Sequence, residues 1–253
     1  MAVLKLVVAY DGTDFRGWAR QPRLRTVQGA LEDALARLLG AAPKLSVAGR
    51  TDAGVHAWGQ VVSFEADADP ERVARALNGI LAPEVVIRSA RIAPEGFDAR
   101  RSATAREYRY RIGTGESPSP FTARYEWHLP GALALRPMRA AARDLLGEHD
   151  FASFCRRPQG DRSTVRRMER LAIARHGERL EVGVRGNAFL HQMVRSLVGT
   201  LVRVGEGRMD PGEIPGVLRA RDRAAAGPVA PARGLVLERV VYGVPRVARG
   251  RER

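Results

Sequence analysis

The strongest constraint on the fold is the order of segments along the chain in which apolar residues recur at the spacing of a strand or of a helix. The first part of the chain predicts a strand, a helix, two strands, a helix and a strand, at residues 3–9, 27–39, 44–48, 60–64, 70–81 and 85–92. Thr26 and Gly40 are placed to cap the first helix, and Asp69 followed by Pro70 opens the second. This β-α-β-β-α-β order is that of a ferredoxin-like unit.

The second part of the chain repeats the order. It predicts strands at 106–112, 171–175, 179–185 and 235–242, a helix at 137–146, and a helix that is capped by Asn187 and runs through Val202. Two long irregular stretches, 148–165 and 205–234, lie between these elements. We therefore expect an α+β protein with two ferredoxin-like halves, residues 1–103 and 104–245, and a basic, disordered tail at 246–253.

Composition narrows the class of protein. Of the 253 residues, 45% are hydrophobic, which allows a buried core and excludes a wholly disordered chain. Cys155 is the single cysteine, so an internal disulfide and a multi-thiolate metal site are excluded. No run of about 18 apolar residues is present, and the N-terminal segment is a poor signal peptide. The expected location is the cytoplasm, without contact to a membrane.

The charge points to a polyanionic partner. Lys and Arg number 42 against 28 Asp and Glu, a net charge of +14, and only Lys5 and Lys44 are lysines. The preference for arginine is typical of GC-rich codon usage, but codon usage does not explain the net charge, whereas a nucleic-acid partner does. An arginine-dense segment between residues 156 and 170 is expected to contact phosphates, with a merely solvated loop as the alternative. The arginines selected for this role are Arg156, Arg157, Arg166 and Arg167.

The segment 48–57, AGRTDAGVHA, carries the candidate for catalytic chemistry. Two glycines bracket its polar residues, so the backbone can turn tightly and present side chains outward. Asp52 is its only carboxylate, and the nearby Arg50 favours the ionised form that a nucleophile needs. An ordinary turn with a surface ion pair would use the same residues. His56 belongs to no pair with metal-ligand spacing, so a structural histidine is favoured over a metal ligand, and no glycine motif for a nucleotide cofactor is present.

Two tyrosines, Tyr108 and Tyr110, share one face of the predicted strand 106–112. Tyrosines in this arrangement usually belong to the core. Exposed aromatic pairs on ferredoxin-like sheets, however, stack on the bases of RNA. The residues alone leave both interpretations open.

Several segments, in order from Tyr10 to Tyr242, resemble the TruA family of tRNA pseudouridine synthases. They are YDGTDFRGWARQP, TVQGALEDAL, AGRTDAGVHAWGQVVSF, LN before ILAPEVVI, REYRYRI, GEHDFASF, NAFLHQMVRSLVGTLVRVG and APARGLVLERVVY. AGRTDAGVHA and NAFLHQMVR are the most specific. The chain departs from the family pattern at Ala19, Asp98 and Gln192, where the family usually has Gln, His and His. None of these departures touches the matched catalytic aspartate.

The resemblance implies the pseudouridine synthase fold, in which the two halves form a mixed, largely antiparallel sheet with helices on one face. It also implies roles for five residues. Asp52 matches the catalytic nucleophile, Arg195 the arginine that pairs with it, and Tyr110 the tyrosine that packs on the uracil. Arg50 matches the arginine that holds the flipped nucleotide out, and Leu235 is placed to line the base pocket.

The implied reaction is isomerisation of uridine to pseudouridine at positions 38, 39 and 40 of the tRNA anticodon stem-loop, by a homodimer without metal or cofactor. The C1′–N1 bond breaks and the uracil rejoins the ribose through C5. Whether Asp52 attacks C1′ or C6 stays open. A non-catalytic RNA-binding protein would leave the Asp52 loop unexplained. A metal-dependent enzyme that hydrolyses RNA would require more clustered carboxylates than this loop supplies.

Overall fold

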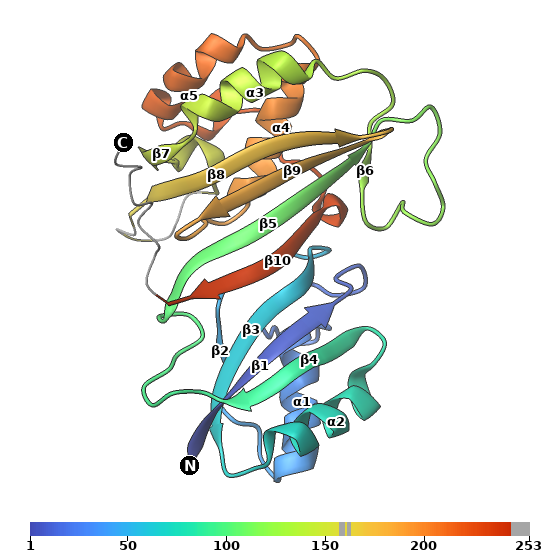
Figure 1. Cartoon of the computed structure of the whole chain (residues 1–253), viewed down its shortest axis with the longest axis vertical. Coiled ribbons are helices and arrows are strands. Elements are labelled where there is room, and N and C mark those ends of the chain that lie inside the picture. The colour runs from blue at the N-terminus through green and yellow to red at the C-terminus, as the bar shows by residue number, and fades with distance from the viewer. Residues whose placement is uncertain (157–159, 161–162, 244–253) are drawn as a thin grey trace, which may run out of the picture.

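The computed structural model describes residues 1–156, 160 and 163–243, which contain one continuous β-sheet (Figure 1). The strands follow the order β4-β1-β3-β10-β5-β9-β8-β7, with β2 paired to β3 and β6 paired to β5. Arg157 and the tail 246–253, both subjects of predictions from the sequence, lie outside the described residues. The strands are β1 (Ala2–Tyr10), β2 (Ser46–Val47), β3 (His56–Ala66), β4 (Val85–Ile92), β5 (Ala103–Gly113), β6 (Trp127–His128), β7 (Gly147–Asp150), β8 (Val165–His176), β9 (Arg179–Gly186) and β10 (Leu235–Tyr242).

Five α-helices and four short 3-10 helices are described. The α-helices are α1 (Val27–Leu39), α2 (Pro70–Leu81), α3 (Leu135–Asp144), α4 (Met193–Gly205) and α5 (Ile214–Ala220). The 3-10 helices are η1 (Ala152–Phe154), η2 (Pro211–Glu213), η3 (Arg223–Ala225) and η4 (Ala232–Gly234). Within the described ranges, no helix has the length and apolar character needed to cross a membrane.

The first unit, from β1 to β4, has the ferredoxin-like order predicted from the sequence. Its strands lie in the order β4-β1-β3-β2, and every neighbouring pair is antiparallel. Local signals set the helix ends as expected. Thr26 accepts a hydrogen bond from the backbone N–H of Gly29, and Gly40 ends α1 in the left-handed conformation with φ of 85°. Asp69 caps α2 through the N–H of Arg72.

The second unit repeats this arrangement with β5, α3, β8, β9, α4 and β10. Its strands lie in the order β10-β5-β9-β8, again with antiparallel neighbours, and β7 extends the outer edge. The predicted repetition of the β-α-β-β-α-β order is therefore confirmed.

The two units join where β10 pairs with β3. This pairing is parallel and aligns Val236 with His56 and Leu237 with Ala57. The parallel pairs β3–β10 and β5–β6 make an otherwise antiparallel sheet mixed. In Figure 1, α1 and α4 both pass behind the strands, so the two units carry these helices on the same face. The predicted α+β class, with a mixed, largely antiparallel sheet, is confirmed.

Some predicted boundaries were wrong. The helix predicted to be capped by Asn187 is α4, and it begins at Met193. Gln192 adopts a left-handed conformation with φ of 63° and turns the chain just before this helix. The Asn187 side chain instead accepts hydrogen bonds from the backbone N–H groups of Arg167 and Ala188. β3 begins at His56 rather than at residue 60, because its first residues pair with β10. The stretch 205–234, predicted to be irregular, contains the helix α5.

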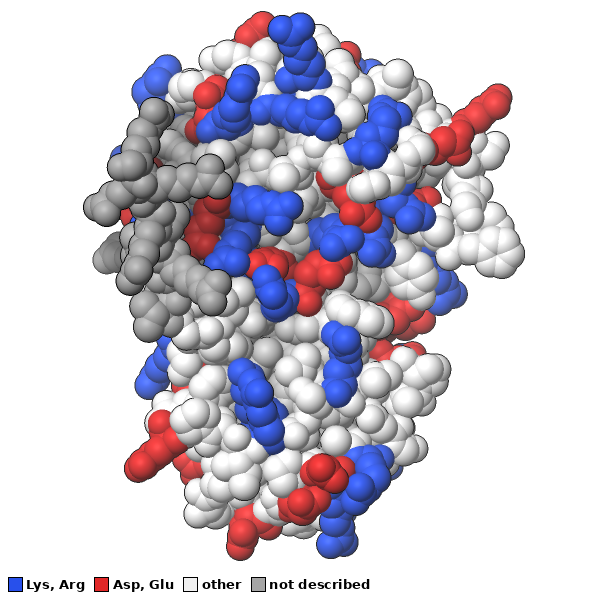
Figure 2. Space-filling view, viewed as in Figure 1, with Lys and Arg blue, Asp and Glu red and all other residues white. Residues whose placement is uncertain are grey.

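The two faces of the sheet in the second unit differ in chemistry. Tyr108, Tyr110 and Ile112 are 9%, 0% and 0% exposed, so the two tyrosines belong to the core. On the opposite face, arginine and glutamate alternate across four strands, and Figure 2 shows them side by side over the middle of the molecule. The ion pairs join Arg109 to Glu181 and Glu238, Arg111 to Glu181, Arg185 to Glu107 and Glu169, and Arg239 to Glu107. We call these eight residues the ion-pair lattice.

Candidate active site

The loop between β2 and β3 carries Asp52 and is held from beneath by buried polar side chains. Gln60 Nε2 donates to the carbonyl of Gly49 at 2.7 Å, and the Tyr10 hydroxyl forms a 2.7 Å hydrogen bond with Thr51 Oγ1. Gln60 and Tyr10 are 0% and 5% exposed. Burial raises the pKa of Tyr10 to about 12, so its hydroxyl remains protonated. These contacts fix the backbone on the N-terminal side of Asp52.

A buried arginine ties the same loop to the second unit. Arg106 is 8% exposed. Its guanidinium donates to the carbonyls of Ala48 (2.8 and 3.2 Å), Arg100 (3.0 Å), Ala103 (3.3 Å) and Asn187 (2.7 Å). Burial lowers the pKa of Arg106, yet an arginine stays protonated in proteins. Because Ala48 leads into the loop that carries Asp52 and Asn187 leads towards α4, Arg106 fixes these two segments relative to each other.

Asp52 lies between two basic side chains of the second unit. Arg195 Nη1 is 3.0 Å from Asp52 Oδ2, and His191 Nε2 is 3.3 Å from Asp52 Oδ1. The side chains of Arg195 and Asp52 are 15% and 20% exposed, whereas that of His191 is 49% exposed. The carboxylate is therefore accessible from solvent on the His191 side and supported by a largely buried cation on the other.

The first turn of α4 positions Arg195. Its Nε donates to the carbonyl of Ala230 at 2.7 Å, and its own backbone carbonyl accepts from the N–H of Ala230. This reciprocal pair joins α4 to the segment before β10, so the guanidinium has a fixed direction towards Asp52. The predicted contact between Arg195 and Asp52 is present in the structure.

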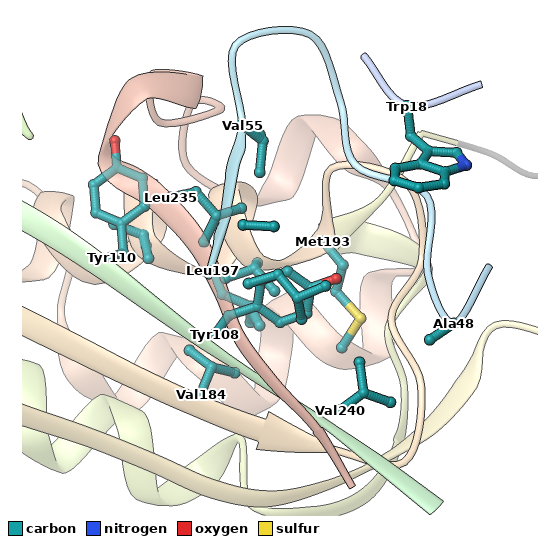
Figure 3. Packing of buried hydrophobic residues seen from close by; sticks show 14 of the residues in the cluster. Trp18, Ala48, Val55, Tyr108, Tyr110, Val184, Met193, Leu197, Leu235 and Val240 are labelled. Carbon is teal, nitrogen blue, oxygen red and sulfur yellow. The ribbon is translucent and has the colours of Figure 1, made fainter. Parts of the chain in front are cut away.

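Tyr110 and Leu235 lie side by side on β5 and β10, where the strand register pairs them (Figure 3). Leu235 is 6% exposed, and Tyr110 is wholly buried. The Tyr110 hydroxyl donates to the carbonyl of Pro231 at 2.7 Å, and Gly234 lies so close to the ring that a Cβ there would be 2.6 Å from it. Burial raises the pKa of Tyr110 well above its usual value. The structure does not bring Tyr110 into hydrogen-bonding contact with Asp52 among the described residues.

The remaining candidates within the described residues are arginines that are exposed or partly exposed. Arg50, two residues before Asp52, is exposed, as are Arg156 and Arg167. The backbone N–H of Arg156 donates to the carbonyl of His191, so this residue lies beside the site. Arg166 is only partly exposed, and its guanidinium donates to the carbonyls of Ser163 and Val165.

His56 has the environment of a structural histidine. It is 6% exposed, its Nδ1 accepts from the N–H of Gly12, and its Nε2 lies 3.1 Å from the carbonyl of Arg124. Burial lowers the pKa of His56, which favours the neutral ring. No group of three or more His, Cys, Asp or Glu residues in the described part of the chain is arranged to hold a metal ion.

His191 is the residue of this site that sequence reasoning did not select. The motif NAFLHQMVR contains it four residues before Arg195, a spacing that places two side chains on the same side of a helix. That spacing was the available signal. The spacing alone does not predict the contact with Asp52, because the helix begins only after Gln192 and Asp52 is far away in sequence.

The sequence is similar to those of known proteins over nearly its whole length. The sequence pattern of the family described as "tRNA pseudouridine synthase" matches residues 6–100 and 141–243. The tRNA pseudouridine synthase A of Methylobacterium sp. (strain 4-46) is 47% identical over 245 residues, covering 95% of this chain and 98% of that protein. That of Geobacter sulfurreducens is 45% identical over 244 residues, covering 96% of this chain and 100% of that protein.

A solved structure, described as a Cbf5-Nop10-Gar1 complex, is also similar. The similarity covers 78% of this chain and 54% of the matched chain, at 14% identity and a TM-score of 0.34. This level of similarity is too low to carry an argument about the site.

Proposed function

Because this chain belongs to the TruA family of tRNA pseudouridine synthases, isomerases that convert uridine in tRNA to pseudouridine, we propose that Asp52 is its catalytic nucleophile. The observation that carries the proposal is the position of this carboxylate, 3.0 Å from the Arg195 guanidinium and partly open to solvent. An ion pair favours the charged carboxylate, and an ionised oxygen is what attacks carbon in covalent catalysis. No metal or cofactor is part of this proposal.

The target nucleotide has to leave its stack to reach Asp52, because only 20% of the Asp52 side chain is exposed. Arg50, exposed two residues before Asp52, is proposed to hold the flipped nucleotide out. Leu235 is proposed to line the base pocket. Tyr110 is proposed to pack on the uracil, which requires the segment with Pro231 and Gly234 to shift, since the tyrosine ring is fully buried beneath it.

The proposed substrates are the uridines at positions 38, 39 and 40 of the tRNA anticodon stem-loop, and the proposed acting form is a cytoplasmic homodimer. The family membership supports tRNA as the substrate. The exposed arginines beside the site, Arg50 and Arg156, support phosphate contacts at its entrance.

The experiment that tests the proposal compares the wild type with Asp52→Asn on unmodified tRNA, with pseudouridines mapped at single-nucleotide resolution. Asn is nearly isosteric but cannot act as a carboxylate nucleophile, so turnover should fall by about 100-fold or more. Affinity for tRNA should remain close to that of the wild type, because it depends mostly on phosphate contacts. Glu65→Gln, an exposed carboxylate of β3, removes one negative charge as a matched control and should leave turnover unchanged. Appreciable activity of Asp52→Asn, above about a hundredth of the wild-type rate, would contradict the assignment.

A further inference from the structure

The contact between His191 and Asp52 has no role in the function proposed so far. The imidazole Nε2 faces Oδ1 of the carboxylate at 3.3 Å, while the guanidinium of Arg195 takes Oδ2. Of the two basic side chains, His191 is the accessible one, with 49% of its side chain exposed against 15% for Arg195. A substrate that approaches Asp52 from the open side therefore meets the imidazole.

The backbone around His191 gives this imidazole a defined place. The carbonyl of His191 accepts a 3.2 Å hydrogen bond from the N–H of Arg156. The next residue, Gln192, turns the chain with φ of 63° and accepts from the N–H of Ser196 in the first turn of α4. His191 and Arg195 are thereby presented to the same carboxylate from one rigid segment.

The isomerisation, if it proceeds as proposed above, needs a group that accepts a proton from C5 and a donor that supplies one to N1, and one group can do both. The C1′–N1 bond breaks with its electron pair on N1, and the C5=C6 pair then forms the C1′–C5 bond. C5 must next lose its proton, so that its C–H pair restores C5=C6, and N1 must gain one. The uracil is neither oxidised nor reduced, and no proton is gained or lost overall. These proton steps are the same whether Asp52 attacks C1′ or C6.

Other groups near the site are unsuited to this transfer. Arg195 does not deprotonate in proteins. Tyr110 forms no hydrogen bond with Asp52 among the described residues, and burial raises the pKa of its hydroxyl. His56 is buried with both ring nitrogens in contact with the backbone. Asp52 is itself occupied as the nucleophile. An imidazole, in contrast, exchanges its proton readily near neutral pH.

We propose that His191 is a catalytic residue that carries the proton from C5 to N1 of the rearranged uracil. The imidazole, whose Nε2 faces Asp52 Oδ1, takes the C5 proton at its other ring nitrogen, Nδ1, and the resulting imidazolium supplies the proton that N1 receives. The proposal rests on the function proposed for Asp52 and deepens it.

The test uses His191→Gln, which keeps a polar N–H group at this position but cannot carry a proton, and His191→Ala. His176→Gln, at the exposed end of β8, is the matched control. Each variant is assayed on two tRNA transcripts, one with ordinary uridine and one with uridine deuterated at C5.

We expect His191→Gln to lose about 100-fold or more in kcat with unchanged affinity for tRNA. Its isotope effect on kcat should exceed that of the wild type, because C5–H cleavage becomes slower than the other steps. Added imidazole should restore part of the activity of His191→Ala, and His176→Gln should match the wild type.

Two results would overturn the proposal while leaving the role of Asp52 intact. The first is a His191→Gln variant within about tenfold of the wild-type kcat, because an amide donor would then suffice. The second is a large loss of kcat without an increased isotope effect, because His191 would then only orient Asp52. An undiminished rate in Asp52→Asn is the separate result that would overturn the proposed function itself.

Discussion

At the scale of single residues, the carboxylate of Asp52 meets a different basic side chain at each oxygen. Arg195 contributes a permanent charge and is itself fixed by the carbonyl of Ala230, so the direction of its guanidinium does not depend on Asp52 alone. His191 has no such second anchor for its ring among the described residues and is far more exposed. The two neighbours are thus suited to different tasks, one to constant charge and one to proton exchange.

We predict that Arg195→Met slows the chemical step much more than it weakens tRNA binding. Truncating one partner of a buried ion pair costs about 3–5 kcal/mol, and the 15% and 20% exposure of this pair places it near the lower limit. Single-turnover rates and tRNA affinities, measured side by side, would separate the two effects. Arg195→Lys keeps the charge, but its single ammonium group cannot contact both Asp52 and the Ala230 carbonyl as the planar guanidinium does. It should therefore recover only part of the rate. A near-normal single-turnover rate in Arg195→Met would show that the pair has no catalytic importance.

At the scale of the elements, the packing of α4 against the segment before β10 determines where Arg195 points. Gly199, one turn beyond Arg195, lies so close to this segment that a Cβ there would be 1.8 Å from the carbonyl of Pro228. Gly227 is equally confined against Thr200, whose hydroxyl accepts from the Gly227 N–H. Both contacts occur two or three residues from Ala230, the carbonyl that anchors Arg195.

We predict that Gly199→Ala destabilises the protein by about 1–3 kcal/mol, the usual cost of overpacking, and also lowers kcat. The added methyl group would push the segment at Pro228 away from α4 and displace the anchor of Arg195. Gly79→Ala is a matched control, since Gly79 is exposed within α2 and its Cβ would meet no atom within 4 Å. That variant should gain about 0.5–1 kcal/mol and keep its activity. Urea unfolding midpoints combined with kcat would test both, and equal stability changes in the two variants would refute the packing argument.

The elements also show which features could be predicted from the sequence. Helix ends with local signals were predicted correctly, because Thr26, Gly40 and Asp69 act on the residues beside them. The start of β3 was missed because its first residues become strand through pairing with β1 and β10, both far away in sequence. In the site, the Arg195–Asp52 pair followed from the family resemblance. The contact of His191 with Asp52 depends on a long-range approach between a loop and a helix that no local pattern encodes.

At the scale of the whole molecule, the excess positive charge of +14 is not spread evenly over the surface that RNA could contact. The four arginines of the ion-pair lattice face four glutamates, so that part of the open sheet face is close to neutral (Figure 2). Surface ion pairs of this kind add little stability. The positive charge left for phosphates therefore resides elsewhere, and the exposed arginines beside Asp52 are candidates for contact with tRNA.

We predict that tRNA binding depends strongly on salt and that Arg156→Ala reduces this dependence. Each neutralised phosphate in a duplex contributes about −0.9 to the slope of log affinity against log salt, and less in single strands. Loss of one contact should make this negative slope shallower by just under one unit. Arg75→Ala, a highly exposed arginine of α2, removes the same charge and should leave the slope unchanged. Equal slopes in Arg156→Ala and the wild type would remove this residue from the RNA-binding surface.

The position of β10 has a consequence for the order in which the protein matures during synthesis. This strand is the last one in chain order among the described elements, yet it lies in the interior of the sheet, between β3 and β5. Until residues 235–242 leave the ribosome, β3 and β5 each present an open edge, and open edges invite pairing with other chains. The first unit can collapse early, but the loop that carries Asp52 obtains its full set of neighbours only at the end of translation. A nascent or prematurely terminated chain would thus be inactive on tRNA and prone to aggregate.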